Sequence, residues 1–325
     1  MEVAPGIYQL KIPIPNNPLG FINSYLVISG QESLLIDTGW NTDEAFESLN
    51  QQLAEAGVKL GDLKYIAITH IHPDHYGLVG RLERQSKAAL VIHEIERNLL
   101  PSRYVHYEDL MEEMDRWLAI NGVPPEDRSS LNRASIEILG LVDVAMPDLT
   151  VHGGEHLLLG DLDLEILWTP GHSAGHICLY ERSRKWLFSG DHILPKITPN
   201  ISMNSQSIGN PLVDYLNSLR QMEQLTTDLV MPGHGAVFTN LAGRIKEIEQ
   251  HHEKRLGEIM ESFQGISKTA YQIAIDISWF LPFNKLAPFS KRMAITETLA
   301  HLELLLAQGR LIKTEQDGII WYAVP

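Results

Sequence analysis

Four potential metal ligands occur within six residues, in the segment His70-Ile71-His72-Pro73-Asp74-His75. The apolar run of residues 65–69 precedes this segment and is typical of a buried strand, and residues 76–80 indicate the start of a helix. The ligands are therefore expected in a loop at the end of a strand. Imidazole and carboxylate groups suit Zn²⁺ or Fe²⁺, and four ligands so close in sequence cannot easily all face one ion. The segment favours a site for two metal ions.

Three later segments place more ligand types just after short apolar runs and beside a glycine. They are Thr169 to His176, Ser189 to His192, and Met231 to Gly235. Glycine lets the backbone turn tightly or approach closely where a site is assembled. Together with the first cluster, these segments argue against a purely structural role for the histidines.

These motifs, in this order, resemble those of the metallo-β-lactamase superfamily, in the branch shared by glyoxalase II, acyl-homoserine lactone lactonases and related hydrolases. The resemblance covers roughly residues 5–240. It implies an α/β fold, the four-layer αββα sandwich. We expect two Zn²⁺ ions per chain, with iron or an iron–zinc pair as alternatives, because histidine and aspartate bind both metals.

The resemblance also assigns a role to each potential ligand. It implies that His70, His72 and His172 hold one ion, that Asp74, His75 and His234 hold the other, and that Asp191 bridges the two. Asp37, in Leu35-Ile36-Asp37-Thr38-Gly39, matches the family aspartate that orients a metal ligand. Asp74 is the expected catalytic residue, accepting a proton from the attacking water that the two ions share as it becomes a bridging hydroxide.

A helical insertion is expected between about residues 94 and 147, where the strand pattern disappears over a stretch longer than a connection needs. Met111, Met114 and Trp117 share one helical face there. Two roles are open to them: ordinary core packing, or lining an acyl pocket, for which methionine is well adapted. His192, next to Asp191, is a further residue that could face substrate.

Residues 1–240 are expected to form the catalytic domain and residues 241–325 a C-terminal domain. Helices followed by a short hairpin around Gln316-Asp317-Gly318 resemble the winged-helix tail of some superfamily members. From His251 to Pro325, eight basic and eight acidic residues balance, so no basic surface predicts DNA binding. We expect instead that this domain serves packing, or that the chain forms homodimers through this domain or the insertion.

Composition restricts the partners and the compartment. A formal net charge of −15 argues against general affinity for nucleic acid. The first residues lack a basic region followed by an apolar stretch, and no apolar run approaches the ~20 residues of a membrane span. A cytoplasmic protein with no membrane partner is therefore expected. The one cysteine, Cys178, excludes an internal disulfide.

The leading functional hypothesis is a binuclear metal-dependent hydrolase of small acyl compounds: thioesters, lactones or esters. The alternative is a nuclease or phosphodiesterase of the same superfamily. A phosphodiester substrate would require a basic groove, yet the insertion is locally acidic between Glu108 and Asp115. An oxygen-reducing di-iron protein of this family usually has an acidic residue where His72 stands, so this histidine counts against that third class.

Overall fold

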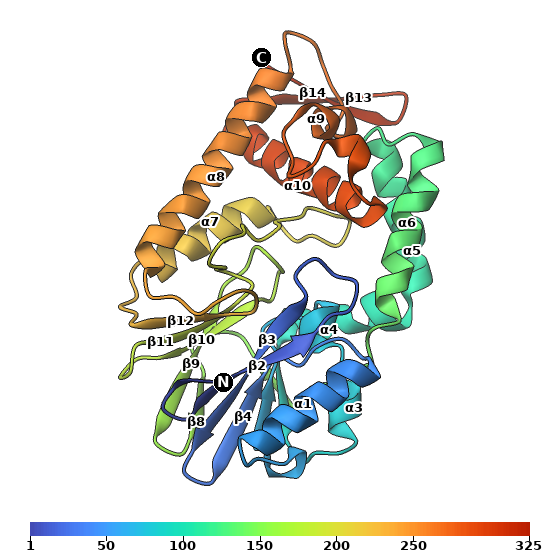
Figure 1. Cartoon of the computed structure of the whole chain (residues 1–325). Helices are drawn as coiled ribbons and strands as arrows, with labels where there is room; N and C mark the ends of the chain where they lie inside the picture. Colours follow the sequence, from blue (N-terminus) through green and yellow to red (C-terminus); the bar gives the residue numbers. More distant parts are fainter.

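The computed structural model describes the backbone of all 325 residues and all side chains except those of residues 134–138. Two β-sheets lie face to face, and helices cover their outer sides (Figure 1). Across the first sheet the strands are β1 (Glu2–Ala4), β2 (Ile7–Pro13), β3 (Phe21–Ser29), β4 (Glu32–Ile36), β5 (Tyr65–Ala67), β6 (Ala89–His93) and β7 (Leu149–Val151). The first four are antiparallel, whereas β4 to β7 are parallel.

The second sheet has five strands, and it carries the later ligand segments. Its order is β12 (Leu229–Pro232), β11 (Trp186–Gly190), β10 (Ile177–Glu181), β9 (Leu162–Trp168) and β8 (His156–Leu159). Strands β11 and β12 are parallel, and the other pairs are antiparallel. The carboxyl ends of β9, β11 and β12 therefore lie at the same edge of the sheet.

Alternating side chains of the strands divide the apolar core into layers. In β4, Leu34 and Ile36 face the second sheet, whereas Leu35 packs beneath the outer helices. In β10, Leu179 faces the first sheet and the buried Cys178 faces the opposite side. Because neighbouring strand residues point to opposite faces, each sheet is covered on both sides. This is the four-layer αββα arrangement, and the predicted fold class is confirmed.

The helices of the sandwich and its insertion follow the strands in chain order. They are α1 (Asp43–Glu55), η1 (Leu60–Asp62), α2 (Pro73–Tyr76), α3 (Val79–Glu83), α4 (Glu94–Leu100), the π-helical turn η2 (Pro101–Val105), α5 (Tyr107–Ile120), α6 (Pro125–Leu139) and α7 (Pro211–Met222). None of the helices that the structure describes combines the length and apolar character needed to cross a membrane.

The C-terminal part packs beside the insertion (Figure 1). It comprises α8 (Leu241–Ser262), α9 (Ala270–Asp276), η3 (Phe283–Lys285), α10 (Pro288–Ala307), β13 (Ile312–Gln316) and β14 (Ile319–Ala323). The last two strands form the expected hairpin. Helix α10 packs against α6, α7, α8 and α9, and one apolar core joins it to the sandwich. Likeness to a winged helix stays a prediction.

Several local expectations were wrong. The ligand cluster does not lie wholly in a loop, because Asp74 and His75 belong to the short helix α2, which begins at Pro73 after the extended residue His72. Proline is well suited to this first helical position, since its missing N–H has no helical partner there. Helix α10 likewise has a proline, Pro288, at its first position, where the missing N–H leaves no helical hydrogen bond unmade. Strand β7 was not predicted at all, because three residues are too short to show a period.

Candidate metal centre

All seven predicted ligands meet where strand ends of the two sheets face each other. The segment from His70 to His75 follows β5, His172 follows β9, Asp191 follows β11, and His234 follows β12. Sites in α/β proteins commonly form at the carboxyl ends of strands, where loops converge. Residues separated by more than 150 positions in the chain are thereby brought into one cluster.

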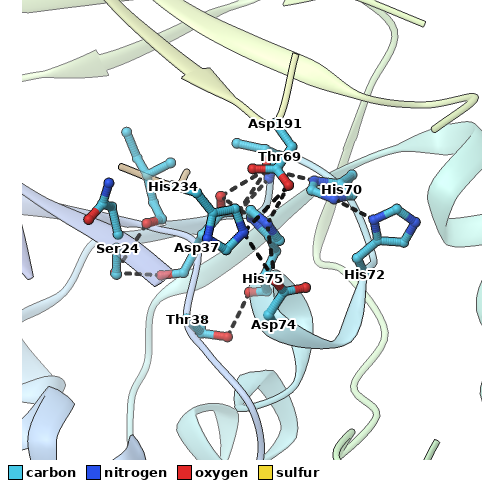
Figure 2. A network of polar contacts seen from close by, with 12 residues as sticks. Ser24, Asp37, Thr38, Thr69, His70, His72, Asp74, His75, Asp191 and His234 are labelled. Atoms are coloured by element: carbon cyan, nitrogen blue, oxygen red, sulfur yellow. Dashed lines mark hydrogen bonds and ion pairs between the residues drawn. The ribbon is translucent and has the colours of Figure 1, made fainter. Parts of the chain in front are cut away.

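The first group of ligands consists of three histidines whose ring nitrogens converge. His72 Nδ1 lies 2.8 Å from His70 Nε2 and 3.0 Å from His172 Nε2. The rings of His70 and His72 are visible in Figure 2. This convergence matches the group that the resemblance assigned to one metal ion.

The second group contains a carboxylate and two imidazoles. Asp74 Oδ2 lies 3.2 Å from His234 Nε2 and 3.9 Å from His75 Nε2. Asp191 Oδ2 lies 3.5 Å from each of the same two nitrogens, and 3.8 Å from His172 Nε2 in the first group. The Asp191 carboxylate therefore stands between the two groups, in the position that a bridging ligand requires (Figure 2).

Close packing of the His234 loop requires glycine at position 233. A Cβ added to Gly233 would lie 2.5 Å from Asp191 Oδ1 and 2.8 Å from His75 Cε1. Any larger residue would push these ligands apart, so the glycine beside His234 serves close approach rather than a turn.

The outward ring nitrogens of four ligands each have a hydrogen-bond acceptor. The pairs are His70 Nδ1 with Thr69 Oγ1 at 3.0 Å, His75 Nδ1 with Asp37 Oδ2 at 2.7 Å, His172 Nδ1 with the Asn200 carbonyl at 3.0 Å, and His234 Nδ1 with the Phe21 carbonyl at 3.3 Å. Acceptors there hold the proton on the outward nitrogen, so the inward nitrogens present lone pairs. Converging lone pairs repel one another unless a cation lies between them. The donor set therefore fits divalent metal ions.

Asp37 is buried and connects the two ligand groups. Its carboxylate accepts from His75 Nδ1, from the Thr69 amide at 2.8 Å, and from Thr69 Oγ1 at 2.8 Å (Figure 2). Its φ of 59° is unusual for a non-glycine residue, and Ser24 Oγ secures this conformation by donating to the Asp37 carbonyl at 2.6 Å. Thr69 in turn contacts His70, so one carboxylate orients a ligand in each group.

Burial and neighbouring charges shift the pKa values within the cluster in different directions. Burial, with the nearby imidazoles of His75 and His72, lowers the pKa of His70 well below its ordinary value. Burial alone would raise the pKa of Asp74, but His75 and His234 lower it to about 2. Asp74 is thus ionised and His70 neutral at neutral pH, the forms that bind metal. Against the effect of burial, the carboxylates of Asp191, Asp37 and Asp74 raise the pKa of His75 well above its ordinary value, so a metal ion would have to displace a proton there.

Two histidines near the cluster have other roles. His176 Nδ1 contacts Thr169 Oγ1 at 2.8 Å, and its Nε2 accepts from the Asp191 amide at 3.1 Å. It therefore positions the Asp191 backbone. The ring of His192 is fully buried, 5.9 Å from the His176 ring and 5.1 Å from the Tyr215 ring, centre to centre. That location gives no support to its suggested contact with substrate.

The methionine and tryptophan stripe of α5 faces the C-terminal part. Met114 is buried in the apolar core that includes Ile273 and Leu299, and Met111 and Trp117 pack against this core. The structure brings the stripe together with C-terminal helices rather than into the ligand cluster. Its role in an acyl pocket stays a prediction, and core packing explains its present contacts.

Glu96 is a residue of the site that the sequence did not reveal. Its buried carboxylate accepts from the Ile71 amide at 3.1 Å and from the Gly175 amide at 2.8 Å. It thereby joins the loop of His70 and His72 to the loop of His172. One feature of the sequence could have revealed it. Glu96 lies one turn before Leu100 on the buried face of α4, where an apolar side chain is usual, so a charged residue there indicates buried hydrogen-bond partners.

Asn200 is a second residue that the sequence did not reveal. Its carbonyl accepts from His172, and its Nδ2 donates to Glu297 Oε2 of α10 at 2.6 Å. Three residues further, the Met203 amide donates to the Thr296 carbonyl of α10 at 2.9 Å. The loop that supports His172 is therefore attached to the C-terminal part.

An αββα sandwich that collects five histidines and two aspartates at its strand ends defines a metallo-hydrolase. The chain belongs to the Metallo-beta-lactamase superfamily, whose family model matches residues 17–234. Members of this superfamily are metal-dependent hydrolases.

Similar proteins extend over the whole chain. "Probable metallo-hydrolase YqjP" of Bacillus subtilis is 26% identical, with 97% of each chain covered. The crystal structure of the metallo-beta-lactamase family protein TTHA1429 from Thermus thermophilus has a TM-score of 0.82 and 31% identity, with both chains covered completely. A beta-lactamase domain protein from Burkholderia ambifaria has a TM-score of 0.84 and 27% identity, covering 100% of this chain and 94% of its own. The C-terminal part is thus shared with these proteins, although the family model ends before it.

Proposed function

We propose that the chain is a binuclear, zinc-dependent hydrolase of small acyl substrates, namely thioesters, lactones or esters. The observation that carries the proposal is the position of Asp191 Oδ2, which lies 3.5–3.8 Å from imidazole nitrogens of both ligand groups. A carboxylate oxygen placed in this way suits two ions that share a ligand.

His70, His72 and His172 would hold one ion, and Asp74, His75 and His234 the other. Two divalent ions at such a site supply Lewis acidity to a carbonyl oxygen and lower the pKa of water. The protein must then accept a proton. Asp74 suits this role because its carboxylate is ionised, and its side chain is 19% exposed against 11% for Asp191, so substrate can reach it.

Acyl substrates are favoured over nucleic acids on grounds of charge. The net charge is −15, and α5 begins with the acidic residues Glu108 and Asp109. A long polyanion would meet repulsion from such a surface, and phosphate contacts dominate affinity for nucleic acid. We therefore expect no hydrolysis of phosphodiesters, which are the negative control in the test.

The proposal is tested by reconstituting the purified chain with zinc and measuring both metal content and initial rates. We expect two ions per chain and turnover of at least one class among thioesters, lactones and esters. One ion at saturation, or turnover confined to phosphodiesters, would overturn it. Reconstitution with iron in parallel decides which metal supports the higher rate.

Three predictions from the sequence remain proposals alongside this function. The chain is proposed to be cytoplasmic, to act on a free small molecule, and to form homodimers through the C-terminal domain or the insertion. Light scattering at several concentrations measures the oligomeric state directly. A mass equal to that of one chain at every concentration would contradict the proposed homodimer.

A further inference from the structure

Glu96, in helix α4, has a fully buried carboxylate whose two oxygens each accept a hydrogen bond from a backbone amide. Oε2 accepts from Ile71 at 3.1 Å, and Oε1 accepts from Gly175 at 2.8 Å. Burying a carboxylate costs free energy unless hydrogen bonds replace those it made with water. The two amides supply these bonds, so the segments that carry them are held against α4 and close to each other.

These two segments carry all three ligands of the first group. Ile71 lies between His70 and His72, and Gly175 lies three residues after His172. One carboxylate therefore spans the two segments whose histidines must converge. A shift of either segment would change the 3.0 Å separation between His72 Nδ1 and His172 Nε2.

The segment after His172 rests directly on α4, and this contact requires glycine at position 175. A Cβ added there would lie 2.7 Å from Glu96 Cγ and 2.9 Å from the Glu96 amide nitrogen. Gly175 does not have a positive φ, so close approach rather than backbone conformation explains the glycine. Trp168 Nε1 also donates to the Ala174 carbonyl at 3.0 Å, which ties the same segment to the end of β9.

The second ligand group has supports of its own. Asp37, after β4, accepts from His75 Nδ1 at 2.7 Å, and the Phe21 carbonyl of β3 accepts from His234 Nδ1 at 3.3 Å. These supports come from strands of the first sheet, whereas Glu96 comes from α4 and bonds to the segments of the first group. A change at Glu96 therefore acts on one group more than on the other.

We propose that Glu96 is a positioning residue that sets the spacing between the segment of His70 and His72 and the segment of His172, and thereby determines the affinity of the first metal ion and not that of the second. It acts through two backbone amides rather than as a ligand. The inference rests on the proposed binuclear function and deepens it, because it makes the first ion separately removable.

The test introduces Glu96→Gln into two variants that each keep one complete ligand group. Glutamine has the same shape, but one oxygen is replaced by an NH2 group that cannot accept from an amide. In His234→Ala, which keeps the first group, Glu96→Gln should weaken zinc binding about 10- to 100-fold. In His72→Ala, which keeps the second group, it should leave zinc affinity unchanged. Competition with a chelator measures the dissociation constants.

Glu94→Gln is the matched control, because Glu94 lies two residues earlier on α4, is 47% exposed and pairs with the exposed His152. It should change neither affinity. Gly175→Ala is an independent variant that keeps the Glu96 carboxylate but forces the segment of His172 away from α4, and it too should weaken only the first ion. Thermal unfolding of the metal-free variants checks the fold, and Gly175→Ala decides the question if Glu96→Gln does not fold.

The outcomes separate this inference from the function on which it rests. Equal weakening of zinc binding in the His234→Ala and His72→Ala backgrounds, or weakening in neither, overturns the selective role of Glu96 and leaves the hydrolase intact. One ion per chain at saturation in the otherwise unchanged protein overturns the binuclear function itself.

Discussion

Asp37 contacts His75 directly and His70 through Thr69, but only the first ligand group is also supported from the C-terminal part. The second group depends on Asp37, which follows β4 and accepts a 2.7 Å hydrogen bond from His75 within the sandwich. The first group depends partly on Asn200, which links His172 to Glu297 of α10. One support lies inside the region of the family model, and the other reaches beyond residue 234. The C-terminal part therefore contributes to the geometry of the site.

Asp74→Ala should have the largest effect, because it removes a ligand of the second group and the proposed proton acceptor together. We expect kcat to fall by about 10²- to 10⁴-fold with the fold intact. Circular dichroism and metal analysis accompany the rate measurement. Near-normal turnover in a folded, metal-loaded variant would contradict this role.

Asp37→Asn should weaken the second group without removing a ligand. Asparagine keeps the shape but loses the charge that favours the His75 N–H, so zinc affinity should fall about 10- to 100-fold. Competition with a chelator measures it. The control is Asp43→Asn, whose carboxylate is 83% exposed on α1. Equal affinities in the two variants would show that Asp37 serves the fold alone.

Glu297→Ala tests the support from α10 and should have a smaller effect on the metal. We expect zinc affinity to fall by up to about 10-fold, because His172 also keeps its contact with the Asn200 carbonyl. Glu297→Gln should recover most of the affinity, since its amide oxygen can still accept from Asn200.

Glu303→Ala is the matched control on the same helix, because Glu303 pairs with Lys313 at 3.0 Å, away from the loop of Asn200. If Glu303→Ala and Glu297→Ala lower zinc affinity equally, α10 acts only through overall stability, and the two supports do not differ in kind.

Trp117→Ala should have the smallest specific effect on catalysis. Its packing against the shared core predicts a loss of about 3 kcal/mol in the free energy of unfolding and similar changes for all substrates. Thermal unfolding and rates across acyl chain lengths measure both. A selective loss on long chains with an unchanged melting temperature would instead assign the stripe to an acyl pocket.

The sequence by itself identified the seven candidate ligands and the strands that precede them. A short, nearly continuous apolar run between turn residues is a local property, so β4 and β10 could be recognised from their own residues. The candidate ligands could be recognised in the same way, because these histidines and aspartates come just after strands or beside a glycine. Composition alone also indicated a large core without disulfides, in which Cys178 is simply buried.

Only the tertiary structure decided which distant groups meet. His72 and His172 lie 100 residues apart yet approach to 3.0 Å, and Asn200 reaches Glu297 across 97 residues. Glu96 was not identified from the sequence, and its role follows from its buried contacts with the Ile71 and Gly175 amides. Local backbone preferences act over a few residues, whereas these contacts depend on how whole layers pack. The supports of the metal centre therefore appear only once the sandwich and α10 are in place.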